Sequence, residues 1–266
     1  MMEASIALLF GLLIGSFLNV CIYRWPLDLS VVKPRSHCIA CGKTIAWYDN
    51  IPLLSFVVLG GQCRYCQKRI SFRYPVVELT TGLLFFYWVY TSGLTLLAAK
   101  MCIFTGMLVA LVFCDLEERI LPDEFTVGGM LAGLVLAGFV PVPDVYAPAL
   151  LWLIGVHPPE RVGWVLQAAL AAGLPAFFLW GVGSLYEKVR HREGLGLGDV
   201  KLVAMMGAFL GLRNTLEAFF IGSLTGSIVS LAYIKFTRKD PSTYELPFGT
   251  FLGLAALYFA FTANSQ

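Results

Sequence analysis

Charged side chains are scarce in this chain. Only 14% of its 266 residues are Asp, Glu, Lys or Arg, while 58% are hydrophobic. Soluble globular domains average about 25% charged and about 45–50% apolar residues. Because a soluble domain of this size cannot bury so much apolar surface, the composition excludes an ordinary water-soluble fold and favours a protein in a lipid bilayer. The formal net charge of +2 also argues against nucleic acid or another polyanion as a partner.

The first residues lack the features of a cleavable signal peptide. Residues 1–23 have no positively charged n-region, Glu3 is acidic, and no small-residue cleavage site precedes Arg24. We therefore expect 1–23 to be a retained first transmembrane helix.

Long apolar runs dominate the rest of the chain. A membrane-spanning helix needs about 20 mainly apolar residues, and eight runs approach this length: 4–23, 75–92, 94–114, 124–141, 163–185, 200–213, 215–235 and 247–263. We expect an all-α polytopic membrane protein with about eight transmembrane helices. The proline-rich segment 141–162 argues against one regular helix and predicts an outer loop or a shallow re-entrant piece.

Basic residues gather in alternate loops. Sixteen of the 19 Lys and Arg residues fall in four segments, 24–75, 115–123, 186–201 and 235–246. With eight spans, all four segments face the same side, and the positive-inside rule assigns that side to the cytoplasm. We expect a multi-pass protein of the bacterial inner membrane, with both termini outside and a small cytoplasmic domain at 24–75. Residues 76–266 would form the main membrane domain.

Four cysteines in the cytoplasmic segment have the spacing of a metal site. Cys38 and Cys41 form one CxxC pair, and Cys63 and Cys66 form a second. Two such pairs supply four sulfur ligands, as in closed structural zinc sites. Two disulfides or four free thiols are the alternatives. Disulfides are rare in the reducing cytoplasm, so we favour structural Zn²⁺, which would also stabilise a segment with little core.

Two aspartates lie at predicted span ends on the cytoplasmic side. Asp115 ends the third run, and Asp199 opens the sixth. Carboxylates beside a membrane span are costly and are functional candidates for that reason. Two neighbouring carboxylates share a proton, so one can act as a base and the other as an acid in peptide hydrolysis. Ordinary helix capping is the alternative for either residue taken alone.

Four further residues are assigned supporting roles. Gly196 and Gly198 precede Asp199 and would permit a close backbone approach. Lys201 is a candidate ion-pair partner for an aspartate. Asp123, which follows Pro122, is a rival to Asp115 and a candidate cap for the fourth run.

Several ordered motifs together resemble bacterial type IV prepilin peptidases, the bifunctional leader peptidases and N-methyltransferases. Asp115 is followed after six residues by Pro122-Asp123. The other matching segments are residues 15–26 (GSFLNVCIYRWP), 34–41 (PRSHCIAC), 50–55 (NIPLLS), 73–80 (RYPVVELT), 192–202 (REGLGLGDVKL) and 246–249 (LPFG). The resemblance runs over nearly the whole chain, and motifs in this order are far more specific than any one of them.

The resemblance implies an aspartic membrane protease with Asp115 and Asp199 as its catalytic pair. It implies that the substrates are prepilin or pseudopilin precursors, which are cut after a glycine. It also implies N-methylation of the new terminal residue by S-adenosylmethionine, a function tied to the cysteine domain and to Gly61. Glu78, at the membrane edge of that domain, is a candidate helper. No Gly-rich dinucleotide-type fingerprint follows a strand, so the donor site cannot be derived from sequence.

Three other functions are compatible with these residues. A peptidase without methyl transfer would tolerate substitution of Gly61. A transporter would use intramembrane aspartates as proton carriers, but it predicts charges near the bilayer midplane rather than at span ends. A membrane scaffold that uses the zinc domain to hold a partner would tolerate loss of Asp199 and fail on loss of Cys38.

Overall fold

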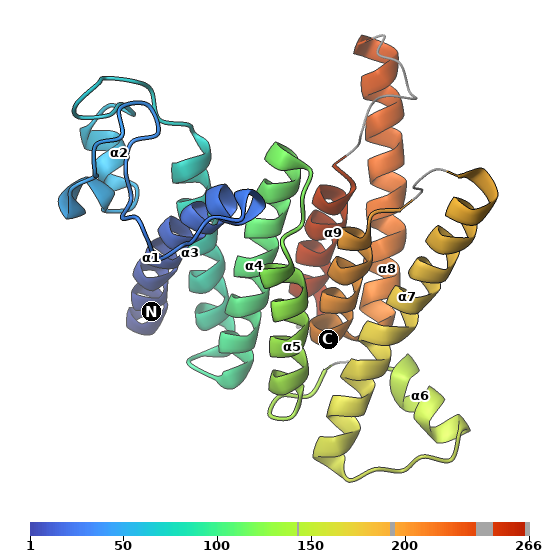
Figure 1. The fold of residues 1–266 in the computed structure, drawn as a ribbon. Helices are drawn as coiled ribbons and strands as arrows, with labels where there is room; N and C mark the ends of the chain where they lie inside the picture. The colour runs from blue at the N-terminus through green and yellow to red at the C-terminus, as the bar shows by residue number, and fades with distance from the viewer. Residues whose placement is uncertain (143, 192–194, 238–246, 264–266) are drawn as a thin grey trace. The chain divides into compact units, whose positions relative to one another are not determined.

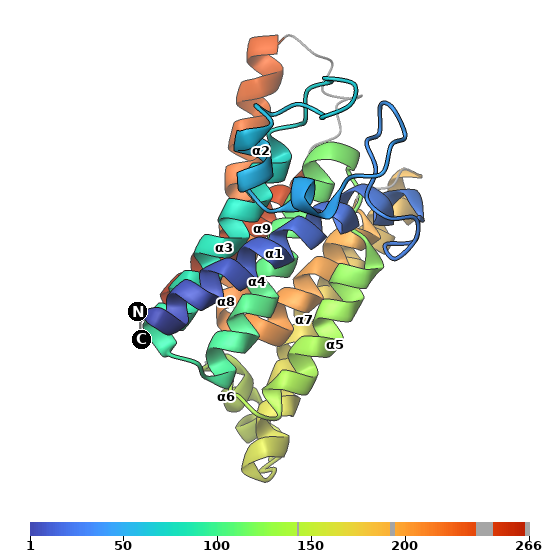
Figure 2. The same cartoon turned by 90° about the vertical axis from the view of Figure 1, so that its left-hand side faces the viewer.

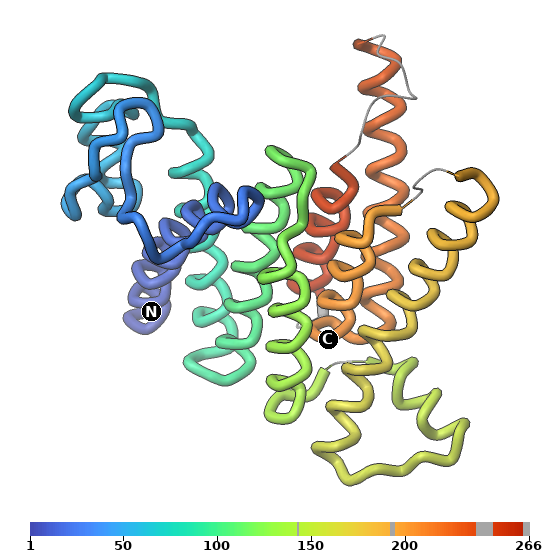
Figure 3. The backbone as a smooth tube through the Cα atoms, viewed as in Figure 1, coloured from blue at the N-terminus to red at the C-terminus, as the bar shows by residue number. Residues whose placement is uncertain are grey.

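The computed structural model describes residues 1–142, 144–191, 195–237 and 247–263. Within these ranges the chain is helical, apart from turns and two isolated β-bridges in the cysteine segment, so the all-α class is confirmed. The contacts divide the chain into two compact units, Met1–Ala110 and Leu111–Gln266. This division does not test the functional domains at 1–23, 24–75 and 76–266, which stay a prediction. Figures 1 and 3 trace the elements in order.

The first unit is built on two packed helices. These are α1 (Met2–Arg24) and α3 (Arg73–Ser92), which lie side by side in Figures 1 and 2. A Cβ on Gly11 would lie 2.8 Å from the Gly82 Cα, and one on Gly15 would lie 2.7 Å from the Glu78 Cα. The spacing of Gly11 and Gly15 is the small-residue pattern that lets membrane helices approach closely. Between α1 and α3 lie η1 (Trp25–Leu27), η2 (Trp47–Asn50), α2 (Leu54–Val58) and the cysteine turns.

The second unit is a helical bundle. Its elements are the end of α4 (Leu96–Glu118), α5 (Asp123–Ala137), α6 (Tyr146–Leu153), α7 (Glu160–Arg190), α8 (Leu197–Thr237) and α9 (Phe248–Ala263). Helix α8 packs against α5, α7 and α9. It consists of two helical parts that meet at Gly211, whose φ of 82° and ψ of 172° are not helical. This break lies near the predicted boundary between the runs 200–213 and 215–235.

The count of eight membrane spans is not confirmed. Among the described residues, four helices are long and apolar enough to cross a membrane: Met2–Leu27, Leu96–Glu118, Glu160–Arg190 and Leu197–Thr237. Helices α5 and α9 have only 15 and 16 residues, and the polar first turns of α3 lower its mean hydropathy. The two runs in α8 correspond to its two helical parts, which meet at Gly211. A multi-pass membrane protein is supported, while crossings by α3, α5 and α9 stay predictions.

The proline-rich segment 141–162 contains the short helix α6 and an aspartate with a structural role. The Asp144 carboxylate accepts hydrogen bonds from the backbone N–H of Leu212, at 2.7 Å, and of Tyr146, at 3.0 Å. It therefore accepts the N–H of the first residue of α6 and also satisfies the free N–H groups of Leu212 and Arg213, which follow the break in α8. The expectation that this segment is not one regular helix agrees with the structure.

A tight glycine contact between α7 and α8 leads to a first prediction. A Cβ on Gly207 would lie 2.1 Å from the carbonyl oxygen of Ala171. Overpacking of this kind costs about 1–3 kcal/mol, so we expect Gly207→Ala to lower the thermal unfolding temperature in detergent. Gly173→Ala is the matched control, because no atom lies within 4 Å of its added methyl group. Equal unfolding temperatures for the two variants would contradict this account of the α7–α8 contact.

Candidate functional site

Asp115 lies in the last turn of α4 and is held by α9. Its side chain is buried, and its Oδ2 accepts two hydrogen bonds from Thr250, one from the backbone N–H at 2.6 Å and one from Oγ1 at 2.7 Å. Thr250 is the third residue of α9, so the carboxylate faces the N-terminal end of that helix, where free N–H groups and the helix dipole favour an acceptor. The contact fixes the orientation of Asp115.

Sequence reasoning missed Thr250, although the signal stood beside the motif LPFG. Gly249 precedes it, and a Cβ there would lie 2.9 Å from Leu121 Cδ1 and 3.3 Å from Asp115 Cγ. The absence of a side chain at Gly249 lets the first turn of α9 approach Asp115 without displacing Leu121. Threonine then adds a hydroxyl donor to the backbone donor at the same oxygen.

Asp199 lies in the first turn of α8 and is half-buried. The structure places it near enough to Asp115 for the two carboxylates to interact electrostatically. Gly198 packs against Leu121, which a Cβ would approach to 3.2 Å, and a Cβ on Gly196 would lie 3.3 Å from Asp199 Oδ2. Gly196 therefore leaves room beside the Asp199 carboxylate, and Gly198 leaves room for Leu121. Their supporting role and the catalytic role of the two aspartates stay predictions.

Lys201 pairs with Asp123 rather than with either member of the aspartate pair. Its Nζ donates to Asp123 Oδ1 at 2.6 Å and Oδ2 at 2.8 Å. Both side chains are partly exposed, at 38% and 62%, so the pair contributes little to stability. Asp123 is the first residue of α5, so the ion pair connects the starts of α5 and α8. Residues 192–194 and 246 of the quoted motifs lie outside the described residues.

The four cysteines of the first unit come together. The sulfur atoms of Cys38, Cys41, Cys63 and Cys66 all lie within 4.8 Å of one another. Each CxxC pair closes a tight turn. The N–H of Gly42 donates to the Cys38 carbonyl at 2.8 Å, and the N–H of Gln67 donates to the Cys63 carbonyl at 3.0 Å. The group is positioned to hold a metal ion such as zinc.

Local hydrogen bonds prepare one of these thiols to bind a metal. The N–H groups of Cys66 and Tyr65 lower the pKa of Cys63 to about 6, because they stabilise its thiolate. Thiolate rather than thiol is the metal ligand. The second turn is also anchored by an ion pair, since Arg64 binds both carboxylate oxygens of Asp49 in η2 at 2.7 Å and 2.5 Å. The hydrogen bond from Arg64 lowers the pKa of Asp49.

Gly61 has a backbone role beside the second cysteine turn. Its φ of 68° is left-handed, and a Cβ would lie 3.0 Å from the Phe56 ring of α2. Its N–H donates to the Phe56 carbonyl at 2.8 Å, and its own carbonyl accepts the Ile70 N–H at 2.7 Å. Gly61 therefore joins α2 to the chain that follows the cysteine turn. A role in cofactor binding stays a prediction.

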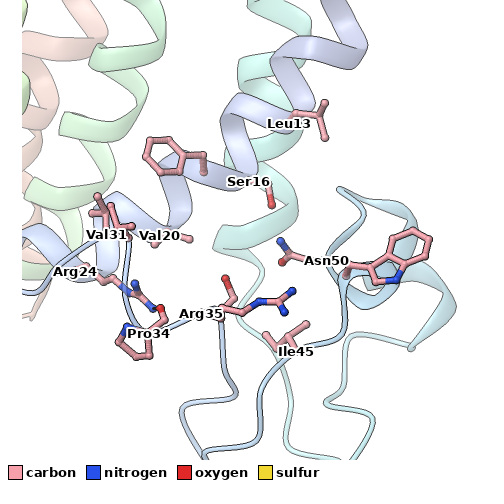
Figure 4. Close-up of a pocket in the computed structure, with 13 residues that line it drawn as sticks. Leu13, Ser16, Val20, Arg24, Val31, Pro34, Arg35, Ile45 and Asn50 are labelled. Atoms are coloured by element: carbon pink, nitrogen blue, oxygen red, sulfur yellow. Dashed lines mark hydrogen bonds between the residues drawn. The ribbon is translucent and has the colours of Figure 1, made fainter.

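Two cavities lie in the first unit. One of about 370 Å³ is bounded by both cysteine turns, η2, α2 and the start of α3, and Glu78 lines it. Glu78 is buried, and its Oε2 accepts the backbone N–H of Leu53 at 2.8 Å. The other cavity, of about 390 Å³, follows α1 and is shown in Figure 4. In that view Ser16, Arg35 and Asn50 extend from three segments into the same space.

Comparison with known proteins identifies the family. A family model described as "Bacterial Peptidase A24 N-terminal domain" matches residues 9–92, and one described as "Type IV leader peptidase family" matches residues 102–231. No solved structure matches the chain.

Three curated relatives carry the name prepilin leader peptidase/N-methyltransferase. The protein from Myxococcus xanthus is 42% identical over 237 residues, which cover 88% of this chain but only 64% of that relative. The protein from Aeromonas salmonicida is 34% identical, with 94% and 88% covered, and that from Pseudomonas aeruginosa is 31% identical, with 93% and 86% covered. With both parts of the chain matched by family models and relatives covered over most of their length, this chain belongs to the bacterial type IV leader peptidase family.

Proposed function

We propose that this chain cuts the leader peptide from type IV prepilins or pseudopilins and N-methylates the residue that the cut exposes. The peptidase half is supported by the positions of Asp115 and Asp199, at the end of one candidate span and the start of another, near enough for their charges to interact. The second half draws on the names of the relatives, which include N-methyltransferase.

The proposed hydrolysis uses the two aspartates as one unit. Two neighbouring carboxylates cannot both ionise easily, so the pair holds one proton between them. The ionised member takes a proton from water as that water attacks the scissile carbonyl carbon. The protonated member donates to the carbonyl oxygen and later to the leaving amine. Thr250 orients Asp115 for this exchange through its two hydrogen bonds.

The proposed orientation places this chemistry at the cytoplasmic face of the bacterial inner membrane. Prepilin precursors combine a basic leader with an apolar segment, so their scissile bond would lie at the membrane interface. Asp115 and Asp199 occupy helix ends rather than helix centres, which suits an interfacial bond and disfavours the transporter alternative.

We propose that the four cysteines hold structural Zn²⁺. The donor set fits, because four sulfur atoms already lie within 4.8 Å of one another and one thiol is inclined to ionise. A site with four protein ligands leaves no open position for catalysis. Bound zinc would supply a rigid link between the two cysteine turns. The methyl donor would be S-adenosylmethionine, with methyl transfer assigned to the cysteine domain.

Neutralising either aspartate tests the peptidase assignment. We expect Asp115→Asn and Asp199→Asn each to lower leader removal from a pilin precursor by about 10²–10⁴-fold, because each removes a proton-transfer group. Methylation of pre-cut pilin should continue in both variants. Glu124→Gln, at an exposed position near the start of α5, is the matched control and should cut like wild type. Normal cleavage by both asparagine variants would refute the assignment of Asp115 and Asp199 as catalytic residues.

The hydroxyl of Thr250 provides a finer test. Thr250→Val keeps the backbone donor but removes the Oγ1 donor to Asp115. Hydrogen bonds to charged groups contribute about 1.5–3 kcal/mol, so we expect kcat for cleavage to fall roughly tenfold or more. Thr225→Val is the control, because that exposed hydroxyl bonds only to the Ile221 and Gly222 carbonyls of its own helix. An unchanged kcat in Thr250→Val would show that Asp115 is oriented without this hydroxyl.

Removal of one sulfur ligand tests the metal site. We expect purified wild type to contain about one zinc ion per chain, measured by elemental analysis, and Cys63→Ser to lose it. Methylation of pre-cut pilin should then fall, because the cysteine turns lose their link, while leader removal should persist. Cys102→Ala, a buried cysteine outside the cluster, should retain the metal. Retention of zinc by Cys63→Ser would contradict the four-sulfur site.

A further inference from the structure

Glu78 is a buried carboxylate without a cation partner among the residues the structure describes. It lies in the second turn of α3 and is 7% exposed. Its hydrogen bonds come from the backbone N–H of Leu53 and the side chain of Ser16, both uncharged donors. Burying a charge without an opposite charge costs much more than burying a paired one. The site therefore favours a ligand that brings positive charge.

Glu78 also holds a strained turn. Leu53 has φ 59° and ψ −47°, and the N–H of Leu54 donates to the Pro52 carbonyl at 2.6 Å, which is a γ-turn. A leucine in this conformation is unfavourable and persists only where surrounding contacts maintain it. The hydrogen bond from the Leu53 N–H to Glu78 is one such contact. Strain of this kind gathers at functional sites.

The cavity of about 370 Å³ contains both Glu78 and Leu53. Its other carboxylate, Asp49, is already neutralised by Arg64. A cavity of this size lined by apolar side chains and a few polar groups is typical of a ligand site. Lys43, Lys68 and Arg69 also line the cavity, and none of them is bonded to Glu78. Glu78 is then the carboxylate of the cavity that remains available to a cationic group.

The neighbouring cavity has an apolar wall on α1 and is also lined by Arg24 and Arg35. Its α1 wall includes Leu13, Phe17 and Val20, and the two cavities share the lining residues Ile45 and Asn50. Ser16 lines the α1 cavity and hydrogen-bonds Glu78. Figure 4 shows Leu13 and Ser16 along α1, with Asn50 opposite Ser16. A ligand with an apolar body and a cationic end could place its body against the α1 wall and its cationic group near Glu78.

We propose that Glu78 binds the free α-ammonium group of the cut pilin, the acceptor in methyl transfer, while the apolar α1 wall takes the apolar residues that follow it. The inference rests on the proposed methyl transfer. The acceptor nitrogen must lose a proton before it attacks, and Glu78 receives that proton. The nitrogen–carbon bond then forms as the sulfur–carbon bond of the donor breaks, and the bonding pair stays on sulfur.

Peptide binding tests the inference without turnover. The probe is a synthetic peptide of the mature pilin's apolar N-terminal segment, with its α-amine either free or acetylated. We expect wild type in detergent to prefer the free amine by about tenfold, the effect of one charged hydrogen bond. Glu78→Gln keeps an acceptor for the Leu53 N–H but removes the charge, so it should lose this preference. Asp49→Asn makes the same charge change in the same cavity and should retain it.

Kinetics give a second readout. Glu78→Gln should raise KM for pre-cut pilin by about tenfold and lower kcat for methyl transfer, because the proton acceptor is lost. Leader removal should be unchanged. The inference is overturned if wild type binds both peptides equally, or if Glu78→Gln behaves like wild type. It is also overturned if Glu78→Gln loses affinity for S-adenosylmethionine but not for S-adenosylhomocysteine, which lacks the sulfonium charge, because Glu78 would then face the sulfonium group. If wild type cuts pilin but never methylates it, the methyl-transfer proposal fails. The peptide-binding comparison then still shows whether Glu78 recognises a free α-amine.

Discussion

Thr250 holds the Asp115 carboxylate through two hydrogen bonds to one oxygen, and the geometry of the aspartate pair depends on this contact. Asp115 closes α4, and Thr250 opens α9, so the contact joins the end of one helix to the start of another. Gly249 makes the approach sterically accessible. Without these bonds, a buried carboxylate would have to keep its charge without donors, which is unfavourable away from water.

The first unit also contains a buried carboxylate that accepts a backbone N–H, but this bond has a different structural role. A carboxylate on α3 accepts a backbone N–H, here from the strained residue Leu53, and the bond keeps an irregular segment in place beside a cavity. In the second unit the carboxylate faces the regular start of a helix, while in the first it supports a turn that is unfavourable by itself. Both arrangements place an acidic group where a substrate group is proposed to react or bind. Each keeps the surrounding backbone hydrogen bonds satisfied.

Local patterns predicted the parts of the site that depend on short spacing. The four-cysteine cluster followed from two CxxC pairs, because a tight turn brings both sulfurs to one point, and the structure places all four together. The proximity of Asp115 and Asp199 was inferred from two helix ends on one predicted membrane side. Thr250 was missed because its contact with Asp115 crosses 135 residues and is set by the packing of α9. Leu53 was missed because leucine carries no local signal for positive φ.

The number of membrane-spanning helices was harder to predict, because hydropathy reports the composition of an apolar run and not the length of the helix that forms there. The runs at 200–213 and 215–235 match the two helical parts of α8 that meet at Gly211, whereas α5 and α9 form helices too short to qualify as spans on length alone. Asp144 compensates the break at Gly211 by accepting the N–H of Leu212. The residue that provides this capping lies in a loop far away in sequence, and hydrophobic periodicity does not reveal it.

The location of each candidate site in its own compact unit bears on how the two proposed reactions evolved to coexist. Asp115, Asp199 and Thr250 lie within Leu111–Gln266, whereas the cysteines, Leu53 and Glu78 lie within Met1–Ala110. Hydrolysis needs a water molecule beside a carboxylate pair, while methyl transfer needs an acceptor amine that has lost its proton. Each carboxylate site takes its hydrogen bonds from residues of its own unit: Asp115 from Thr250, and Glu78 from Leu53.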